Sequence, residues 1–279
     1  MKISPMLKQR VITAVILFVA LLAALFALPP LAWSALIALM VWQGAVEWAR
    51  MSKMSGRFAT AYCAVSLLLM IAIFWLDSGY SPGTVPLPHL FWYFAAVILW
   101  VLIVPAWMIA GWRPQNIWIM GLTGWAVLIP TGLAMIDLRS ASPWWLLGAM
   151  SVVWVADTAA YFAGKKFGQN KLAPEISPGK TWEGVFGALL IVTIYVLIVG
   201  WSTGLFKNYP ILPGIIIASW WWVGLAVIGD LFESAVKRQA GVKDSGTLLP
   251  GHGGLLDRID ALTSTLPFAA LALVFQQLA

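Results

Sequence analysis

The chain of 279 residues is 61% hydrophobic and only 10% charged, with a mean hydropathy of +0.88. Because a water-facing surface needs many more polar groups than this, the composition excludes an ordinary soluble protein and favours one that crosses a membrane many times. The single cysteine, Cys63, excludes an internal disulfide, and the net charge of +6 comes without any pattern that suggests nucleic-acid binding.

Nine apolar runs follow one another, each close to the roughly 17–25 residues that a helix needs to cross a bilayer. Backbone groups in lipid must hydrogen-bond within their own segment, and no short alternating strands suggest a barrel. We therefore predict an all-α polytopic membrane protein with about nine transmembrane helices. The runs lie near residues 10–28, 30–49, 59–76, 90–110, 116–136, 143–163, 183–203, 211–229 and 259–278.

The first run follows three basic residues and in that respect is similar to a signal peptide. However, a second apolar run begins directly after Pro29 and Pro30. Cleavage would release another span rather than a soluble domain, so the two runs are expected to form a helical hairpin. The eighteen Trp residues fit a membrane protein too, because indole rings favour membrane interfaces.

The basic residues are concentrated in alternate connections between the predicted spans. If the N-terminus is cytoplasmic, fifteen of the seventeen lie inside and only Arg139 and Lys207 lie outside. This bias predicts a cytoplasmic N-terminus and a periplasmic C-terminus. The inside set is Lys2, Lys8, Arg10, Arg50, Lys53, Arg57, Arg113, Lys165, Lys166, Lys171, Lys180, Lys237, Arg238, Lys243 and Arg258.

The charge is distributed unevenly along a chain that otherwise forms a single integral-membrane domain, 1–279. We expect N-terminal spans in 1–140 and catalytic spans in 141–279, with the charged loops 164–182 and 230–258 on the cytoplasmic face. Residues 230–260 alone hold five of the eleven acidic residues, so the chemistry is expected there. Glu47, Asp77 and Asp137 lie at span ends or outside loops, where contact with water explains them.

Three carboxylates are expected to meet at the cytoplasmic mouth of the last two spans. Asp257 and Asp260 are three residues apart, which places them on one helix face, and Asp230 ends the preceding span at the same level. Clustered anions repel one another unless a cation joins them, and oxygen ligands suit Mg²⁺. The alternative is that Asp257 caps the helix and Asp260 gains from its dipole, which leaves Asp230 unexplained.

Cations lie between these carboxylates. Lys237, Arg238, Lys243 and Arg258 would hold phosphate oxygens that a metal leaves free, as phosphoryl transfer requires. Any single lysine here is also explained as a positive-inside residue. The glycine-rich run 249–254 contains His252, which either contacts phosphate or is a turn residue.

The other cytoplasmic loop contains Ser177, Lys180 and Thr181 in the order Ser-Pro-Gly-Lys-Thr. It is not a phosphate-binding loop of the Walker type, because Pro174 occupies the position of a required glycine. Lys180 still suits phosphate binding, with Ser177 and Thr181 as hydrogen-bond donors. Asp157 lies inside the sixth span, where an ionisable side chain is costly and indicates a function.

The charged segment resembles the signature of the phosphatidate cytidylyltransferases, also called CDP-diacylglycerol synthases, with no departure from the pattern. The segments 157–168 and 177–183 are similar to the family as well, while the N-terminal half is similar mainly in its spans. The signature reads Ser234-x-Val236-Lys237-Arg238-x₄-Lys243-Asp244-x-Gly246-x₂-Leu249-Pro250-x-His252-Gly253-Gly254-Leu255-x-Asp257-Arg258-Ile259-Asp260.

The resemblance implies a reaction in which CTP and phosphatidic acid give CDP-diacylglycerol and pyrophosphate. It also implies a requirement for Mg²⁺, K⁺ as a second cation, and a homodimer in a bacterial inner membrane whose cavity opens to the cytoplasm. The expected metal ligands are Asp230, Asp257 and Asp260, which are also catalytic together with Lys237 and Asp244. The expected substrate-binding residues are Asp157, Ser177, Lys180, Thr181, Arg238, Lys243, His252 and Arg258.

Two other classes of function stay open on the sequence. One is a membrane enzyme that uses CTP on a different lipid, such as a polyprenol kinase or an ether-lipid cytidylyltransferase, because apolar composition does not specify the acceptor pocket. The other is a cation transporter with Asp157 and Asp230 as intramembrane ligands. A transporter has no need of the glycine-rich and lysine-rich loop.

Overall fold

The computed structural model describes residues 5–77, 84–204, 212–248, 251 and 253–278, and every predicted span within them is helical. The fourth span combines α4, the π-helix η2 and α5. The elements are α1 (Pro5–Ala27), α2 (Pro30–Met51), α3 (Gly56–Leu76), α4 (His89–Ile98), η2 (Leu99–Ile103), α5 (Val104–Ile109), α6 (Ile117–Ala141), α7 (Pro143–Phe167), β1 (Lys171–Ala173), β2 (Ser177–Thr181), α8 (Trp182–Ser202), α9 (Leu212–Ala240) and α10 (Leu256–Leu278).

Eight helices of the described chain are long and apolar enough to cross a membrane, and α1 adds the shorter apolar stretch Ile12–Ala27. The prediction of an all-α polytopic membrane protein is therefore confirmed. The local sequence explains several helix starts. Asn116 caps α6 by accepting from the Trp118 amide at 2.9 Å, and α2 and α7 each begin at a proline, which lacks the amide that a first helical turn leaves unpaired.

Both predicted charged loops are shorter in the structure than expected. Helix α9 continues eleven residues past the predicted end of its span, to Ala240, so residues 230–240 are helical and the loop is 241–255. The charged side chains lie at helical spacing, and Lys237 pairs with Glu233 one turn earlier. The end of an apolar run marks where the chain leaves the lipid, and the helix itself can continue beyond that point.

The second loop, 164–182, also contains regular structure. Helix α7 extends to Phe167, and β1 pairs with β2 in an antiparallel hairpin.

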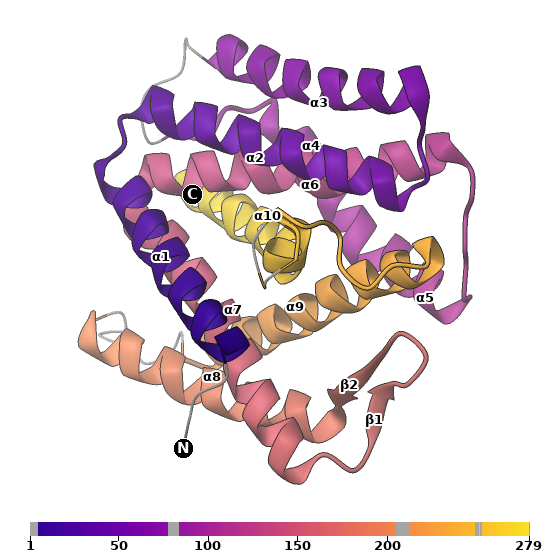
Figure 1. Ribbon diagram of the computed structural model, residues 1–279. Helices are drawn as coiled ribbons and strands as arrows, with labels where there is room; N and C mark the ends of the chain where they lie inside the picture. Colours follow the sequence, from indigo (N-terminus) through magenta and orange to yellow (C-terminus); the bar gives the residue numbers. More distant parts are fainter. Residues whose placement is uncertain (1–4, 78–83, 205–211, 249–250, 252, 279) are drawn as a thin grey trace.

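Helix α6 lies at the centre of the bundle, where it packs against α2, α4, α7 and α10 (Figure 1). Two indole N–H groups of α2 donate to carbonyls of α6: Trp33 to Met135 at 3.2 Å and Trp48 to Met120 at 2.7 Å. Both tryptophans are buried, and so is Trp100. These three indole rings pack inside the protein, while the expectation that tryptophans lie at membrane interfaces stays a prediction.

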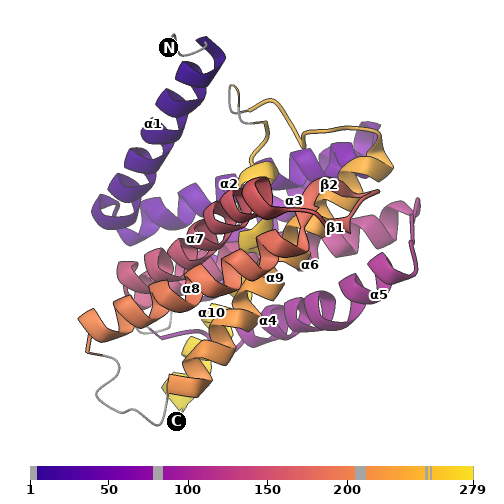
Figure 2. The ribbon, with the colours of Figure 1, turned by 90° about the horizontal axis from the view of Figure 1, so that it is seen from below.

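The connections gather at two opposite ends of the bundle (Figure 1). The hairpin β1–β2, the end of α9 and the α5–α6 connection share one end, whereas the C-terminus lies at the other. Figure 2 shows α1 standing apart from the other helices. Its contacts with α7 include edge-to-face packing of Phe18 on Trp154 and a tilted contact of Phe26 with Trp144.

The acidic residues at the end that holds the C-terminus do not face water as expected. Asp137 is only 4% exposed and accepts from His89 Nδ1 at 2.7 Å and from the Tyr93 hydroxyl, while Asp77 pairs with His89 Nε2 at 2.8 Å. This buried cluster joins α3, α4 and α6. Arg139 donates to the Leu25 carbonyl at 2.8 Å and so fastens the end of α1.

The close approach of α2 and α3 to α6 gives a test of this packing. A Cβ at Gly124 would overlap the Tyr62 hydroxyl and the Trp48 indole nitrogen, whereas a Cβ at Gly148 on α7 would meet no atom within 4 Å. Gly124→Ala is expected to lower stability by about 1–3 kcal/mol through overpacking. Gly148→Ala is the matched control and should leave stability nearly unchanged. Thermal unfolding in detergent, followed by tryptophan fluorescence, measures both; equal midpoints would contradict the packing.

Candidate active site

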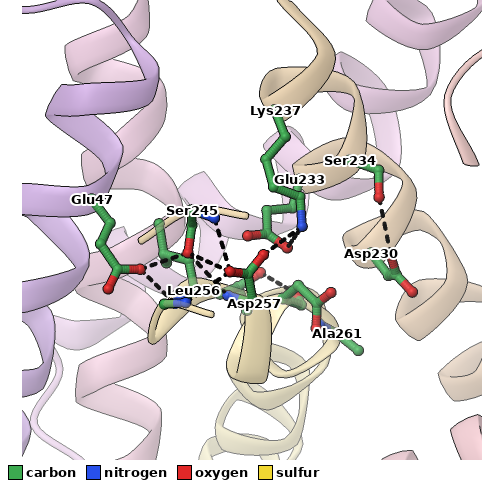
Figure 3. A network of polar contacts seen from close by, with 12 residues as sticks. Glu47, Asp230, Glu233, Ser234, Lys237, Ser245, Leu256, Asp257 and Ala261 are labelled. Atoms are coloured by element: carbon green, nitrogen blue, oxygen red, sulfur yellow. Dashed lines mark hydrogen bonds and ion pairs between the residues drawn. The ribbon is translucent and has the colours of Figure 1, made fainter. Parts of the chain in front are cut away.

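A network of charged and polar groups joins α2, α9, α10 and the loop 241–255 (Figure 3). On α9, the spacing of Asp230, Glu233, Ser234 and Lys237 places all four on one helix face. That face lies against the first turn of α10. Helix α10 approaches closely because Gly229 has no side chain: a Cβ there would lie 2.7 Å from the Asp260 carbonyl oxygen. The geometry thus brings the predicted acids of both helices together.

Lys237 bridges two carboxylates within this network. Its Nζ lies 2.6 Å from Asp257 Oδ1 and 3.2 Å from Glu233 Oε2. The three side chains are 12%, 5% and 7% exposed, in the order Lys237, Asp257 and Glu233. A buried ion pair of this kind needs both signs present, because removing one partner leaves an uncompensated charge. Lys237 therefore holds two protein carboxylates together, and its predicted catalytic role stays a prediction.

Asp257 closes the loop 241–255 on itself. Its Oδ2 accepts from the Ser245 amide at 2.8 Å and the Gly254 amide at 2.9 Å, and it lies 3.0 Å from the Ser245 hydroxyl oxygen. With Lys237 on the other oxygen, both oxygens of Asp257 are engaged by donors. Gly251 and Gly253 in this loop have φ angles of 75° and 82°, a left-handed conformation that suits glycine.

Glu47, which the sequence interpretation assigned to solvent, is 1% exposed and caps α10 from α2. One oxygen, Oε1, accepts from the Leu255 amide at 2.8 Å. The other, Oε2, accepts from the Leu256 amide at 2.9 Å and the Ser245 hydroxyl at 2.7 Å. The first amides of a helix lack intrahelical acceptors, and here a distant carboxylate supplies them. No local pattern around Glu47 signals this contact, since its partners lie about two hundred residues away.

Lys180 and Asp230 form the more open part of the site. Lys180 Nζ lies 2.7 Å from Asp230 Oδ2, and the two side chains are 23% and 32% exposed. Asp157 is exposed and lies within electrostatic range of both. Arg238 Nε donates to the Ile176 carbonyl of the hairpin at 3.4 Å. The two predicted cytoplasmic loops therefore do meet at one place.

The donor set fits a cation in part. Asp260 lies within electrostatic range of Asp230, Glu233 and Asp157, and Glu233 Oε1 is buried without a hydrogen-bond donor. Oxygens of Asp230, Asp260 and Glu233 are the kind that Mg²⁺ prefers. However, no three acidic, histidine or cysteine side chains in the described part of the chain are close enough to form a complete metal site. Both oxygens of Asp257 already accept from protein donors, and its assignment as a ligand stays a prediction.

The remaining predicted residues have different surroundings. Lys243, Asp244 and Arg258 are exposed around the loop, and Ser177 is partly buried on β2. Thr181 is 4% exposed, and its hydroxyl oxygen caps α8 by accepting from the Gly184 amide at 3.2 Å. Its structural role is clear, while its binding role stays a prediction. His252 lies outside the described residues.

Comparisons with known proteins agree with the pattern of residues. The model of the cytidylyltransferase family matches residues 8–276. A phosphatidate cytidylyltransferase of Pseudomonas aeruginosa is 41% identical over 270 residues, which are 95% of this chain and 97% of that protein. The phosphatidate cytidylyltransferase of Haemophilus influenzae is 35% identical over 282 residues, covering 94% and 97%. One from Staphylococcus aureus strain COL is 42% identical over 139 residues, about half of each chain.

Proposed function

Because the chain belongs to the cytidylyltransferase family, we propose that it is a phosphatidate cytidylyltransferase of phospholipid biosynthesis. It transfers the cytidylyl group of CTP to phosphatidic acid, giving CDP-diacylglycerol and pyrophosphate. The observation that carries this proposal is the match of two curated phosphatidate cytidylyltransferases over almost all of this chain and almost all of their own length. The acids and lysines gathered at one end of the helical bundle support it.

The acceptor in this reaction is a phosphate monoester with a second pKa of about 6, so much of it is already dianionic at neutral pH. The site therefore does not need a strong general base. The obstacle is the approach of one polyanion to another. The exposed cations Arg238, Lys243 and Arg258 would hold phosphate oxygens and the pyrophosphate group at the mouth.

Lys180 is the cation best placed to leave its protein carboxylate and bind a substrate phosphate. It is a quarter exposed and pairs with Asp230, so an incoming phosphate can compete for it. Asp230 and Asp260 would hold Mg²⁺, with Asp257 as the further predicted ligand. When bound, Mg²⁺ neutralises triphosphate charge and makes the α-phosphorus more electrophilic. Lys237 keeps Glu233 and Asp257 in place rather than binding substrate. K⁺ as a second cation is part of the same proposal.

The alternatives differ in their products. A polyprenol kinase would release CDP, whereas a cytidylyltransferase releases pyrophosphate. An ether-lipid cytidylyltransferase would release pyrophosphate but use a different acceptor. A transporter would move cations across vesicles in the absence of CTP. The curated relatives favour phosphatidic acid as the acceptor.

We also propose that the protein is a homodimer in a bacterial inner membrane, with its active site, its N-terminus and the hairpin in the cytoplasm and its C-terminus in the periplasm. The distribution of basic residues supports this orientation. In a Cys63→Ser background, an impermeant maleimide should label Leu87→Cys in intact spheroplasts, and Lys171→Cys only after permeabilisation. The reverse pattern contradicts the orientation. The mass of the protein in nanodiscs tests the dimer.

The activity itself is tested with purified protein, labelled CTP, phosphatidic acid and Mg²⁺. We expect labelled CDP-diacylglycerol, loss of activity with EDTA, and recovery on adding Mg²⁺. Asp260→Asn should lower kcat by about 100-fold or more, because losing a group that stabilises transition-state charge has effects of this order. Glu175→Gln, an exposed acid in the hairpin turn, is the control and should keep full activity. Failure of the wild type to form the product, or an unimpaired Asp260→Asn, contradicts the proposal.

The mechanism makes a stereochemical prediction. Direct in-line attack of the lipid phosphate on the α-phosphorus of CTP inverts the configuration of that phosphorus. CTP with a chiral α-thiophosphate, analysed by phosphorus NMR of the product, should therefore show inversion. Net retention would instead indicate a covalent cytidylyl-enzyme.

A further inference from the structure

The carboxylate of Glu47 is withdrawn from water yet has a full set of hydrogen-bond donors. Each of its oxygens accepts two hydrogen bonds: Oε1 from the Leu255 amide and from Gln43 Nε2 at 3.0 Å, and Oε2 from the Leu256 amide and the Ser245 hydroxyl. Burying a charged carboxylate is costly unless such donors replace water. Figure 3 shows the side chain pointing from α2 toward Ser245 and Leu256. Because donors from three separate parts of the chain converge on this one carboxylate, the contact is a specific feature of the fold.

Three of the four donors belong to the two ends of the loop 241–255 and the start of α10. Ser245 also touches Asp257 through both its amide and its hydroxyl. The Ser245 hydroxyl has one hydrogen, and its shorter contact, 2.7 Å, is to Glu47. A continuous chain of contacts therefore runs from Glu47 through Ser245 to Asp257, and from Asp257 to Lys237 and Glu233.

Two glycines of the loop pack so closely against the Glu47 carboxylate that there is little room for a side chain. A Cβ at Gly246 would lie 3.0 Å from Glu47 Oε1, and a Cβ at Gly254 would overlap Glu47 Oε2 and the Ser245 hydroxyl. The amides of Gly254 and Leu255 donate to Asp257 and Glu47. The amide of Gly254, which ends the glycine-rich run, and the next amide along the chain are thus engaged by the protein's own carboxylates and are not free for a substrate phosphate.

We infer that Glu47 is a positioning residue: it fixes Ser245, Leu255 and the start of α10, and through them Asp257 and Asp260. It touches no substrate. This inference rests on the proposed function, and it gives the N-terminal half of the chain a direct part in the site. Displacing reacting groups by about 1 Å can cost about 100-fold in rate, so the effect should appear in kcat.

The test compares Glu47→Gln and Glu47→Asp with Glu175→Gln as the matched control. Glu47→Gln keeps the shape but places an amide N–H against backbone N–H donors, and kcat should fall about 100-fold while KM for CTP changes less than about threefold. Glu47→Asp keeps two acceptor oxygens and should recover at least a tenth of the wild-type kcat. Glu175→Gln makes the same change at an exposed acid of the hairpin turn, and its kcat should stay within about twofold of the wild type. All are assayed well below their unfolding midpoints.

A second measurement does not depend on catalysis. Hydrogen–deuterium exchange of peptides covering 241–256 should be at least tenfold faster in Glu47→Gln than in the wild type, with the core of α6 unchanged. If Glu47→Gln keeps kcat within twofold, or is more active than Glu47→Asp, or leaves loop exchange unchanged, the inference is overturned. If the wild type forms no CDP-diacylglycerol while Glu47→Gln still accelerates loop exchange, the proposed function fails and the fixing of the loop by Glu47 stands.

Discussion

A carboxylate that leaves water must be met by hydrogen-bond donors or by a cation, and the functional end of this protein depends on that constraint. Glu47 accepts from the amides of Leu255 and Leu256, and Asp257 pairs with Lys237 and accepts from the loop amides. Asp230, which stays partly exposed, pairs with Lys180. Each of these contacts joins a different pair of structural elements. Together they hold α2, α9, α10 and the hairpin in one arrangement.

The same constraint separates a fixed part of the site from an open part. Lys237 and Asp257 are nearly inaccessible and have all their partners within the protein. Lys180 and Asp230 are more accessible and hold each other with a single contact. The buried pair can keep the geometry of the site fixed. The exposed pair is weakly held, so a phosphate can replace Asp230 as the partner of Lys180. Glu233 Oε1 lies between these parts without a donor.

Buried polar groups organise the opposite end as well. Asp137 accepts from His89 and Tyr93, and Asp77 holds the other ring nitrogen of His89, so three helices are joined where lipid would offer no hydrogen bonds. Helix α6 carries Asp137 at this end and accepts indole hydrogen bonds from α2 along its length. Since α6 also packs on α10, both ends of the molecule depend on one central helix.

The spans, the family resemblance and the separation of charge followed from the sequence alone, because a bilayer imposes length and apolar composition locally and the signature is continuous in the chain. The end of α9 did not, since hydropathy reports lipid contact while α9 continues to Ala240 through paired charges. Nor did the role of Glu47, whose partners lie about two hundred residues away. Tertiary structure alone decided which carboxylates receive donors and which keep free oxygens. That outcome depends on which helix faces meet, and one-dimensional spacing does not specify it.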